Sequence, residues 1–147
     1  MSESRVLVVD ADQERGQRIA GVLEFIDASP RMVGGVDEVD RAKARPGDWL
    51  AIVVGDIEDE AEWKAFCAWL SKEPLHPPLL LLPQHHAGGA RAFGIHEALC
   101  WPLDLPLKHA QLTELLRRAS IRQLEEAAKR ESSDTHGPTG NSPAVQR

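Results

Sequence analysis

The feature that most constrains the fold is an uninterrupted apolar run, WLAIVV at positions 49–54, which ends at Gly55 and Asp56. A run of this kind, rich in β-branched residues, is typical of a strand buried on both faces of a parallel sheet. Gly55 allows the backbone to turn after the strand. Asp56 then stands at the carboxyl end of the strand, the edge at which open parallel sheets bind ligands. Asp56 is therefore the first candidate functional residue.

Strand-like and helix-like segments alternate along the rest of the chain. Short apolar runs predict further strands at residues 6–9, 30–36, 79–82 and 98–101. Apolar residues at helical spacing predict helices at 13–26, at 37–44, around Trp63, Phe66 and Trp69, and at 106–129, with one more turn at 90–93. Asp12 stands at the N-cap position of the first helix. This alternation predicts parallel strands joined by right-handed crossovers, in a three-layer α/β/α sandwich.

The last predicted helix, residues 106–129, is longer than a small sheet needs, because it would extend for about 36 Å. Its apolar residues recur at spacings that suggest a short coiled coil, namely Leu112, Leu116, Ala119 and Leu124. A frayed helix end on a monomer is the alternative. We divide the chain into a folded regulatory domain (1–120), a helical extension (121–131) and a flexible linker rich in Ser, Gly, Pro and Thr (132–147).

Length and composition restrict the class of protein. A chain of 147 residues is long enough for one domain with a core, and its net charge of -6 argues against nucleic-acid binding by this domain. No apolar run approaches the roughly 18 residues that cross a bilayer, and the N-terminus has no signal-peptide pattern. Cys67 and Cys100 lie in apolar runs, which is not the pattern of a disulfide framework. We expect a cytoplasmic location without membrane contact.

Acids after the first strand and at the end of the third give the chain a recognisable pattern. Over residues 5–120 it resembles the receiver domain of bacterial two-component regulators. That resemblance implies a flavodoxin-like fold with a five-stranded parallel sheet in the order 2-1-3-4-5. In the family, two adjacent acids bind magnesium and an Asp ending the third strand accepts phosphate. A Ser or Thr ends the fourth strand, and a Lys followed by a cis proline ends the fifth.

Only part of this family pattern is kept. Asp10 falls on the first acidic position and Asp56 on the phosphoacceptor position. Pro102 keeps the proline after the fifth strand, so the resemblance predicts a cis peptide between Trp101 and Pro102. We therefore interpret Asp56 as a vestigial phosphoacceptor, and Asp10 with Asp12 as a vestigial acidic pocket.

Three other family positions are substituted. Ala11 replaces the second acid, Pro83 the hydroxyl residue and Trp101 the lysine, so the charges that assist phosphoryl transfer are missing. Asp12 or Glu58 could still complete a magnesium site, but a helix cap and a solvated loop acid explain them better. We expect no metal site and no cofactor, with magnesium as the one alternative.

The C-terminal residues of the chain resemble a particular group of these regulators. Residues 140–147 resemble the opening of the AAA+ domain in NtrC-type enhancer-binding activators, whose domain order is receiver, long helix and AAA+ domain. Residues 5–23 and the apolar third strand are similar to the degenerate receivers of FleQ-type flagellar regulators. This implies a regulator of flagellar and biofilm genes with an accessory ATPase as partner. The AAA+ domain of such regulators binds cyclic di-GMP, and nothing indicates that this domain contacts it.

Two further sets of residues deserve a prediction. His85, His86 and His96 could be taken for metal ligands, but adjacent histidines point in different directions, so we expect surface loop residues. Trp63 and Trp69 form a helical stripe that is either core or partner surface. Together with Leu124 they are our candidate interface residues.

These observations leave competing functions. The leading hypothesis is a non-catalytic regulatory domain that dimerises and acts without phosphorylation. The alternative is a working receiver that takes a phosphoryl group on Asp56. A flavodoxin-like enzyme is a third reading, which rests on fold analogy alone.

Overall fold

The computed structural model describes residues 4–34, 48–55, 60–72, 76–82, 95, 97–104 and 106–135. Several predictions lie outside these residues. They concern Asp56, Glu58, Pro83, the three loop histidines, the helical segments predicted at 37–44 and 90–93, and most of the C-terminal linker.

Five parallel strands form one sheet in the order β2-β1-β3-β4-β5. The strands are β1 (Arg5–Val9), β2 (Ser29–Val33), β3 (Ala51–Val54), β4 (Leu79–Leu81) and β5 (Cys100–Pro102). This is the predicted sheet order, and the flavodoxin-like α/β/α fold is confirmed. Trp49 and Leu50, predicted as strand, precede β3 and are buried beside it.

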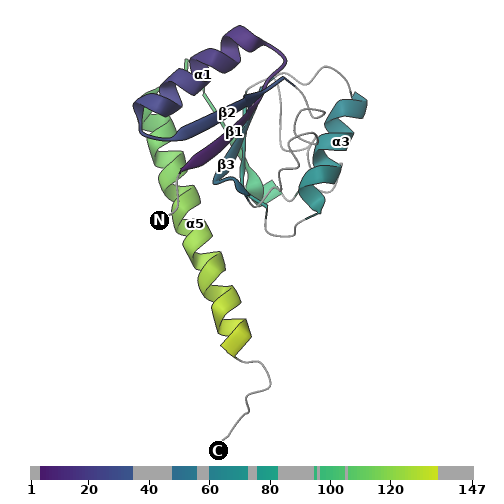
Figure 1. Ribbon diagram of the computed structural model, residues 1–147, viewed down its shortest axis with the longest axis vertical. Coiled ribbons are helices and arrows are strands. Elements are labelled where there is room, and N and C mark those ends of the chain that lie inside the picture. The colour runs from purple at the N-terminus through teal and green to yellow at the C-terminus, as the bar shows by residue number, and fades with distance from the viewer. Residues whose placement is uncertain are drawn as a thin grey trace, which may run out of the picture.

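The helices are α1 (Gln13–Phe25), α3 (Glu60–Ser71) and α5 (His109–Thr135), with a short 3-10 helix η2 at Glu97–Leu99. Figure 1 shows α1 and α5 on one face of the sheet and α3 on the other. It also shows α5 continuing well past the sheet toward the C-terminus. The sheet therefore lies between two helical layers, and α5 extends beyond the sandwich.

Burial follows the alternation of side chains along the strands. Every residue of β3 and β4 is buried, as the apolar runs predict for central parallel strands. Ile52 and Val54 pack with Phe66 and Leu70 of α3. On the opposite face, the described core includes side chains from β1, β3, β4, α1 and α5, among them Val6, Val8, Val53, Leu80, Ile19, Leu23, Leu112, Leu115, Leu116 and Ala119.

The strand register brings the carboxyl ends of the central strands to one edge. Val9 is paired with both Val33 of β2 and Val54 of β3. Just beyond these pairs, the backbone N–H of Asp10 donates to the Val33 carbonyl at 3.1 Å, and that of Gly55 donates to the Val9 carbonyl at 2.8 Å. Asp10 and Gly55 thus lie side by side at the carboxyl edge of the sheet.

Candidate functional site

The candidate site is the carboxyl edge of the sheet, and Asp10 is its central described residue. Its side chain is only 1% exposed. Its carboxylate accepts hydrogen bonds from the backbone N–H of Asp12 at 2.9 Å and from Nε and Nη2 of Arg15 at 2.8 Å each. The two Arg15 bonds go to different carboxylate oxygens, so the ion pair is bidentate, the strongest geometry available to these groups.

Arg15 reaches Asp10 because of how α1 begins. The Asp12 side chain accepts a hydrogen bond from the backbone N–H of Arg15 at 3.1 Å, which confirms Asp12 as the N-cap. The helix then passes close to the sheet at Gly16, where an added Cβ would lie 3.7 Å from the Cβ of Asp10. This close approach brings the first turn of α1, and with it Arg15, to the buried carboxylate. Sequence reasoning missed Arg15 altogether.

Gly55 gives Asp10 the space it occupies. A Cβ added at position 55 would overlap the Asp10 carboxyl group and would lie 2.9 Å from its Cβ. A Cβ atom essentially never lies so close to a non-bonded heavy atom. The sequence analysis explained Gly55 by a turn after the strand. In the structure, Gly55 is required because any side chain at this position would occupy the space of the Asp10 carboxyl group.

The described residues do not fit the magnesium ion that the receiver fold implies. Magnesium requires free oxygen ligands in near-octahedral geometry. Both Asp10 oxygens are held by a cation of the protein itself, and Ala11 offers no ligand. Asp12 serves as a cap. In the described part of the chain, no group of three or more His, Cys, Asp or Glu side chains could hold a metal.

Trp101 lies on the α5 side of β5. Its Nε1–H donates to the Ala98 carbonyl at 3.0 Å, and the guanidinium carbon of Arg118 lies 4.7 Å from the ring centroid. The ring packs against the cluster formed by β1, β3, β4, α1 and α5. The described contacts of the indole are thus with this cluster, with Arg118 of α5 and with the turn before β5. Pro102 ends β5, and its cis peptide stays a prediction.

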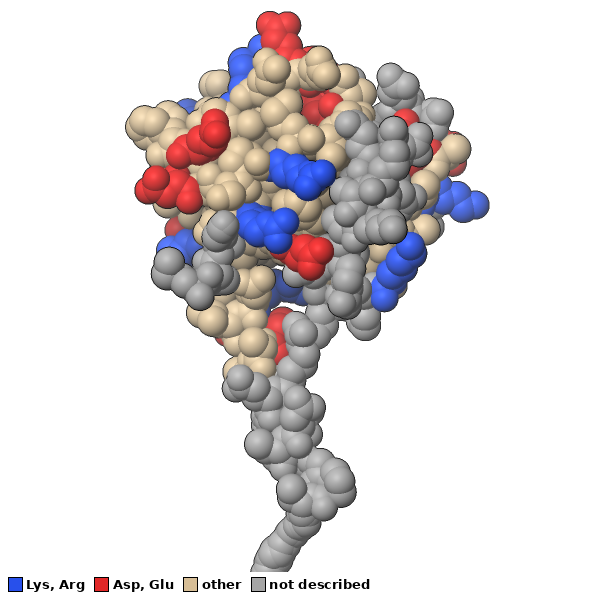
Figure 2. All heavy atoms as spheres, viewed as in Figure 1, with Lys and Arg blue, Asp and Glu red and all other residues tan. Residues whose placement is uncertain are grey.

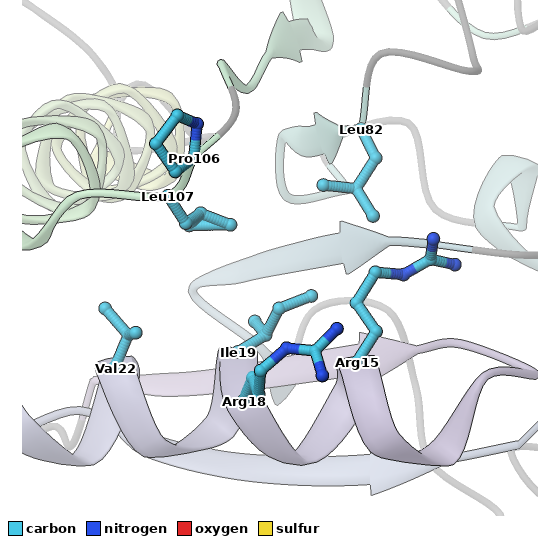
Figure 3. A pocket seen from close by; sticks show the side chains of 7 residues that line it. All are labelled: Arg15, Arg18, Ile19, Val22, Leu82, Pro106 and Leu107. Atoms are coloured by element: carbon cyan, nitrogen blue, oxygen red, sulfur yellow. The ribbon is translucent and has the colours of Figure 1, made fainter.

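A cavity of about 610 Å³ lies between α1 and the segment that leads into α5. In Figure 3, Ile19 and Val22 of α1 face Leu107 and Pro106, while Leu82 lies beyond β4. Two arginines of α1 also line it, but Arg15 is paired with Asp10, and Arg18 lies 3.5 Å from Glu14. None of these described lining residues is a nucleophile or a general base, so they do not form a catalytic site.

The interface candidates occupy different environments. Trp69 is 4% exposed and belongs to the core under α3, so the idea that it marks a partner surface is wrong. Trp63 is half-buried and stacks on Phe66 with ring centroids 5.8 Å apart. Leu124 is 71% exposed and Ile121 44% exposed, and both lie beyond Ala119, the last buried residue among the described side chains of α5.

Charge on the visible face is mixed. Figure 2 shows acidic and basic side chains interspersed among uncharged residues over the part of the face that belongs to described residues. The drawn surface therefore offers no extended patch of one sign there. Separately, no described helix is long and apolar enough to cross a membrane.

Comparison with solved structures identifies the fold. The chain superimposes on a receiver domain from Bacillus halodurans C-125 with a TM-score of 0.61 and 13% identity, covering 80% of this chain and 97% of that one. A signal receiver domain of an HD domain-containing protein from Pseudomonas fluorescens Pf-5 gives a TM-score of 0.64 and 15% identity, covering 86% and 94%. A pilus assembly-related protein from Burkholderia pseudomallei K96243 gives 0.60 and 21%, covering 80% and 90%. These likenesses show the receiver fold.

Comparison of the sequence with known protein families identifies the family of this chain. The family described as "Flagellar regulatory protein FleQ" matches residues 5–121, and the chain belongs to that family. No curated protein matches the chain. The domain is thus a FleQ-like receiver domain of a regulator, a class that is not typically catalytic.

Proposed function

We propose that this domain regulates the protein that carries it through self-association, without accepting a phosphoryl group. The observation that carries the proposal is the exposed apolar surface of α5 beyond Ala119. Ile121 and Leu124 are large, exposed and three residues apart, and Ala128 follows four residues later. Spacings of three and four residues form the seam of a coiled coil.

The length of α5 supports the same proposal. The described helix continues to Thr135, although Ala119 is the last of its described side chains to be buried. A helical overhang of this length is marginal in water unless its apolar face is covered. A second copy of the same helix would cover it, because two seams of this kind interlock. We propose a homodimer with the interface centred on Leu124.

The proposal against phosphorylation rests on the carboxyl edge. Asp10 is bound to Arg15, the second acidic position is Ala11, and Trp101 takes the lysine position. Catalysis of phosphoryl transfer depends on cations positioned around the transferred group. With these positions changed, we propose that Asp56 is not a productive phosphoacceptor. A phosphorylatable receiver using Asp56 is the alternative.

Membership of the FleQ family supports a proposal about the kind of protein in which this domain acts. FleQ-type regulators control flagellar and biofilm genes, and we propose that the domain acts in the cytoplasm on an attached AAA+ domain, in a regulator that binds an accessory ATPase. Cyclic di-GMP, in this proposal, acts on the AAA+ domain. The receiver domain contributes the dimer contact and touches neither nucleic acid nor membrane.

Sedimentation equilibrium of the chain tests the contact. We expect a dimer at micromolar concentration, and a folded monomer for Leu124→Glu, because a charge buried across an apolar contact is strongly unfavourable. Gln123→Glu is the matched control: it adds a charge at the neighbouring exposed position and should leave the dimer intact. A wild-type monomer well above micromolar concentration would remove the proposal's main support. Trp63→Glu tests the α3 surface in the same way.

Intact-mass spectrometry tests the alternative. The chain is incubated with magnesium and acetyl phosphate, and we expect no stoichiometric gain of one phosphate. A gain that disappears in Asp56→Asn would establish the working receiver in place of our proposal.

A further inference from the structure

We infer that the guanidinium of Arg15 is the resident cation of the carboxyl edge and that it excludes a divalent ion from Asp10. The inference deepens the proposed function, on which its biological meaning rests: it names the residue that makes the edge independent of magnesium. It concerns a residue that belongs to none of the family positions considered above.

The first step is the burial of Asp10. A carboxylate with 1% exposure has lost nearly all of its hydration, so it needs a compensating charge and a full set of hydrogen bonds. Arg15 supplies the charge through two bonds of 2.8 Å, and Asp12 supplies a backbone N–H at 2.9 Å. The charge of Asp10 is thereby balanced within the protein.

The second step is competition for the same oxygens. Arg15 Nη2 and the Asp12 N–H converge on Oδ1 of Asp10, while Arg15 Nε occupies Oδ2. A divalent ion would have to displace the guanidinium and then find its remaining ligands where Ala11 provides none. Two cations cannot share the carboxylate at contact distance without strong repulsion.

The third step is that the surrounding chain is shaped for this pair. Gly55 leaves the space in which the Asp10 carboxyl group lies, and Gly16 allows α1 to approach the edge. Figure 3 shows the Arg15 side chain extending from α1 toward the end at which the strand arrows point. Arg15 itself is only 24% exposed at the side chain, so its position is enclosed by the fold.

Thermal unfolding of the full chain, with and without 10 mM MgCl2, tests the inference. We expect the wild-type Tm to be unchanged by magnesium. Arg15→Ala should have a lower Tm, because it leaves a buried carboxylate unpaired, and magnesium should restore part of it by binding the vacated site. Adding Asp10→Asn to Arg15→Ala should abolish the response to magnesium. Arg18→Ala is the matched control on the same helix, and should behave as wild type because its contact with Glu14 is exposed.

Titration with Mn²⁺, followed by paramagnetic broadening of amide signals, gives a second readout. Broadening centred on residues 10–15 is expected in Arg15→Ala and absent in the wild type. Broadening there at equal Mn²⁺ concentration in the wild type would overturn the inference, as would an Arg15→Ala variant that responds to neither ion. If Arg15→Ala does not fold, Arg15→Gln replaces it under the same criteria, and the wild-type titration stands independently.

The outcomes separate the inference from the proposed function. Wild-type protein that binds Mn²⁺ at the edge but still dimerises and gains no phosphate would defeat the role of Arg15 alone. Phosphate transfer to Asp56 would defeat the proposed function, whatever Arg15→Ala does.

Discussion

A Cβ atom at position 55 would overlap the carboxyl group of Asp10. Gly55 directly follows β3 and Asp10 directly follows β1, and the two strands are adjacent in the sheet. The carboxyl group of Asp10 lies over the end of β3, and in that position it forms the ion pair with Arg15. The ion pair therefore depends on an interstrand contact as well as on the charges themselves.

Gly55→Ala should lower the free energy of unfolding by about 1–3 kcal/mol, since a methyl group must displace a buried, hydrogen-bonded carboxylate. Chemical denaturation measures this. Gly21→Ala is the control, because nothing lies within 4 Å of an added Cβ there and the residue is exposed within α1. It should raise the same quantity by about 0.5–1 kcal/mol. Equal stability of Gly55→Ala and wild type would refute the packing of Asp10 over Gly55.

His76 should make the fold sensitive to mild acid. The residue is 5% exposed, and burial lowers its pKa below the ordinary 6.5, although its Nδ1 bond to the Pro77 carbonyl acts in the opposite direction and nearby Arg122 adds to the lowering. The unfolded chain therefore binds the proton more readily. Stability from this group is complete above pH 6.5 and is lost as the pH falls from there toward the lower folded-state pKa.

Denaturation at pH 7 and pH 5 checks this expectation. His76→Asn, which can keep a donor near the Nδ1 position, should lose less stability between the two pH values than wild type does. A His76→Asn curve parallel to wild type would show that His76 does not titrate differently on unfolding.

Cys67 should be chemically inert in the folded protein. Burial, with a smaller contribution from Cys100, raises the pKa of Cys67 to about 12. Because the thiolate is the reactive species, its population at pH 8 is on the order of one in ten thousand. A thiol-reactive chromogenic reagent should modify Cys67 only after the chain is unfolded in guanidinium chloride. Rapid modification under native conditions, assigned to Cys67 by peptide mapping, would contradict the burial.

Arg118 should stabilise the fold through Trp101. Its guanidinium carbon lies 4.7 Å from the indole centroid, and an interaction of this kind contributes about 0.5–1 kcal/mol at exposed sites. Arg118→Ala should lower the free energy of unfolding by that amount and shift the tryptophan emission. Arg117→Ala removes the neighbouring arginine, whose described partner is Glu114, and should have little effect. If the two variants are equally stable, the stacking contributes nothing.

The apolar runs allowed the sheet to be predicted, because buried parallel strands need little else. The runs around Val8, Val53 and Leu80 became the central strands in the expected order. Helix ends were harder. The last helix was expected from Pro106 but begins at His109, since the segment before it is tied by two hydrogen bonds between Asp104 and Gln111, at 2.6 and 3.2 Å. No periodicity in a sequence signals such a local contact.

The site was less predictable than the sheet. Asp10 could be identified because it falls on an acidic position of the receiver family. Arg15 could not, because an arginine in the first turn of a helix is usually a solvated surface residue. Its role depends on the approach of α1 at Gly16, which is a tertiary property. Trp69 is a similar case. Helical spacing does not show whether the sheet is large enough to cover the indole, and in the structure Trp69 is buried in the core beneath α3.

The course of α5 has a mechanical consequence. Its buried described side chains, such as Leu112, Leu116 and Ala119, lie in its first three turns, whereas its 27 residues extend for roughly 40 Å. A stiff rod held at one end is a lever: tilting the anchored turns by about 10° would displace the far end, about 24 Å beyond Ala119, by roughly 4 Å. Repacking of less than a side-chain diameter beneath Leu112 would therefore reach whatever follows Thr135 as a movement of several ångströms.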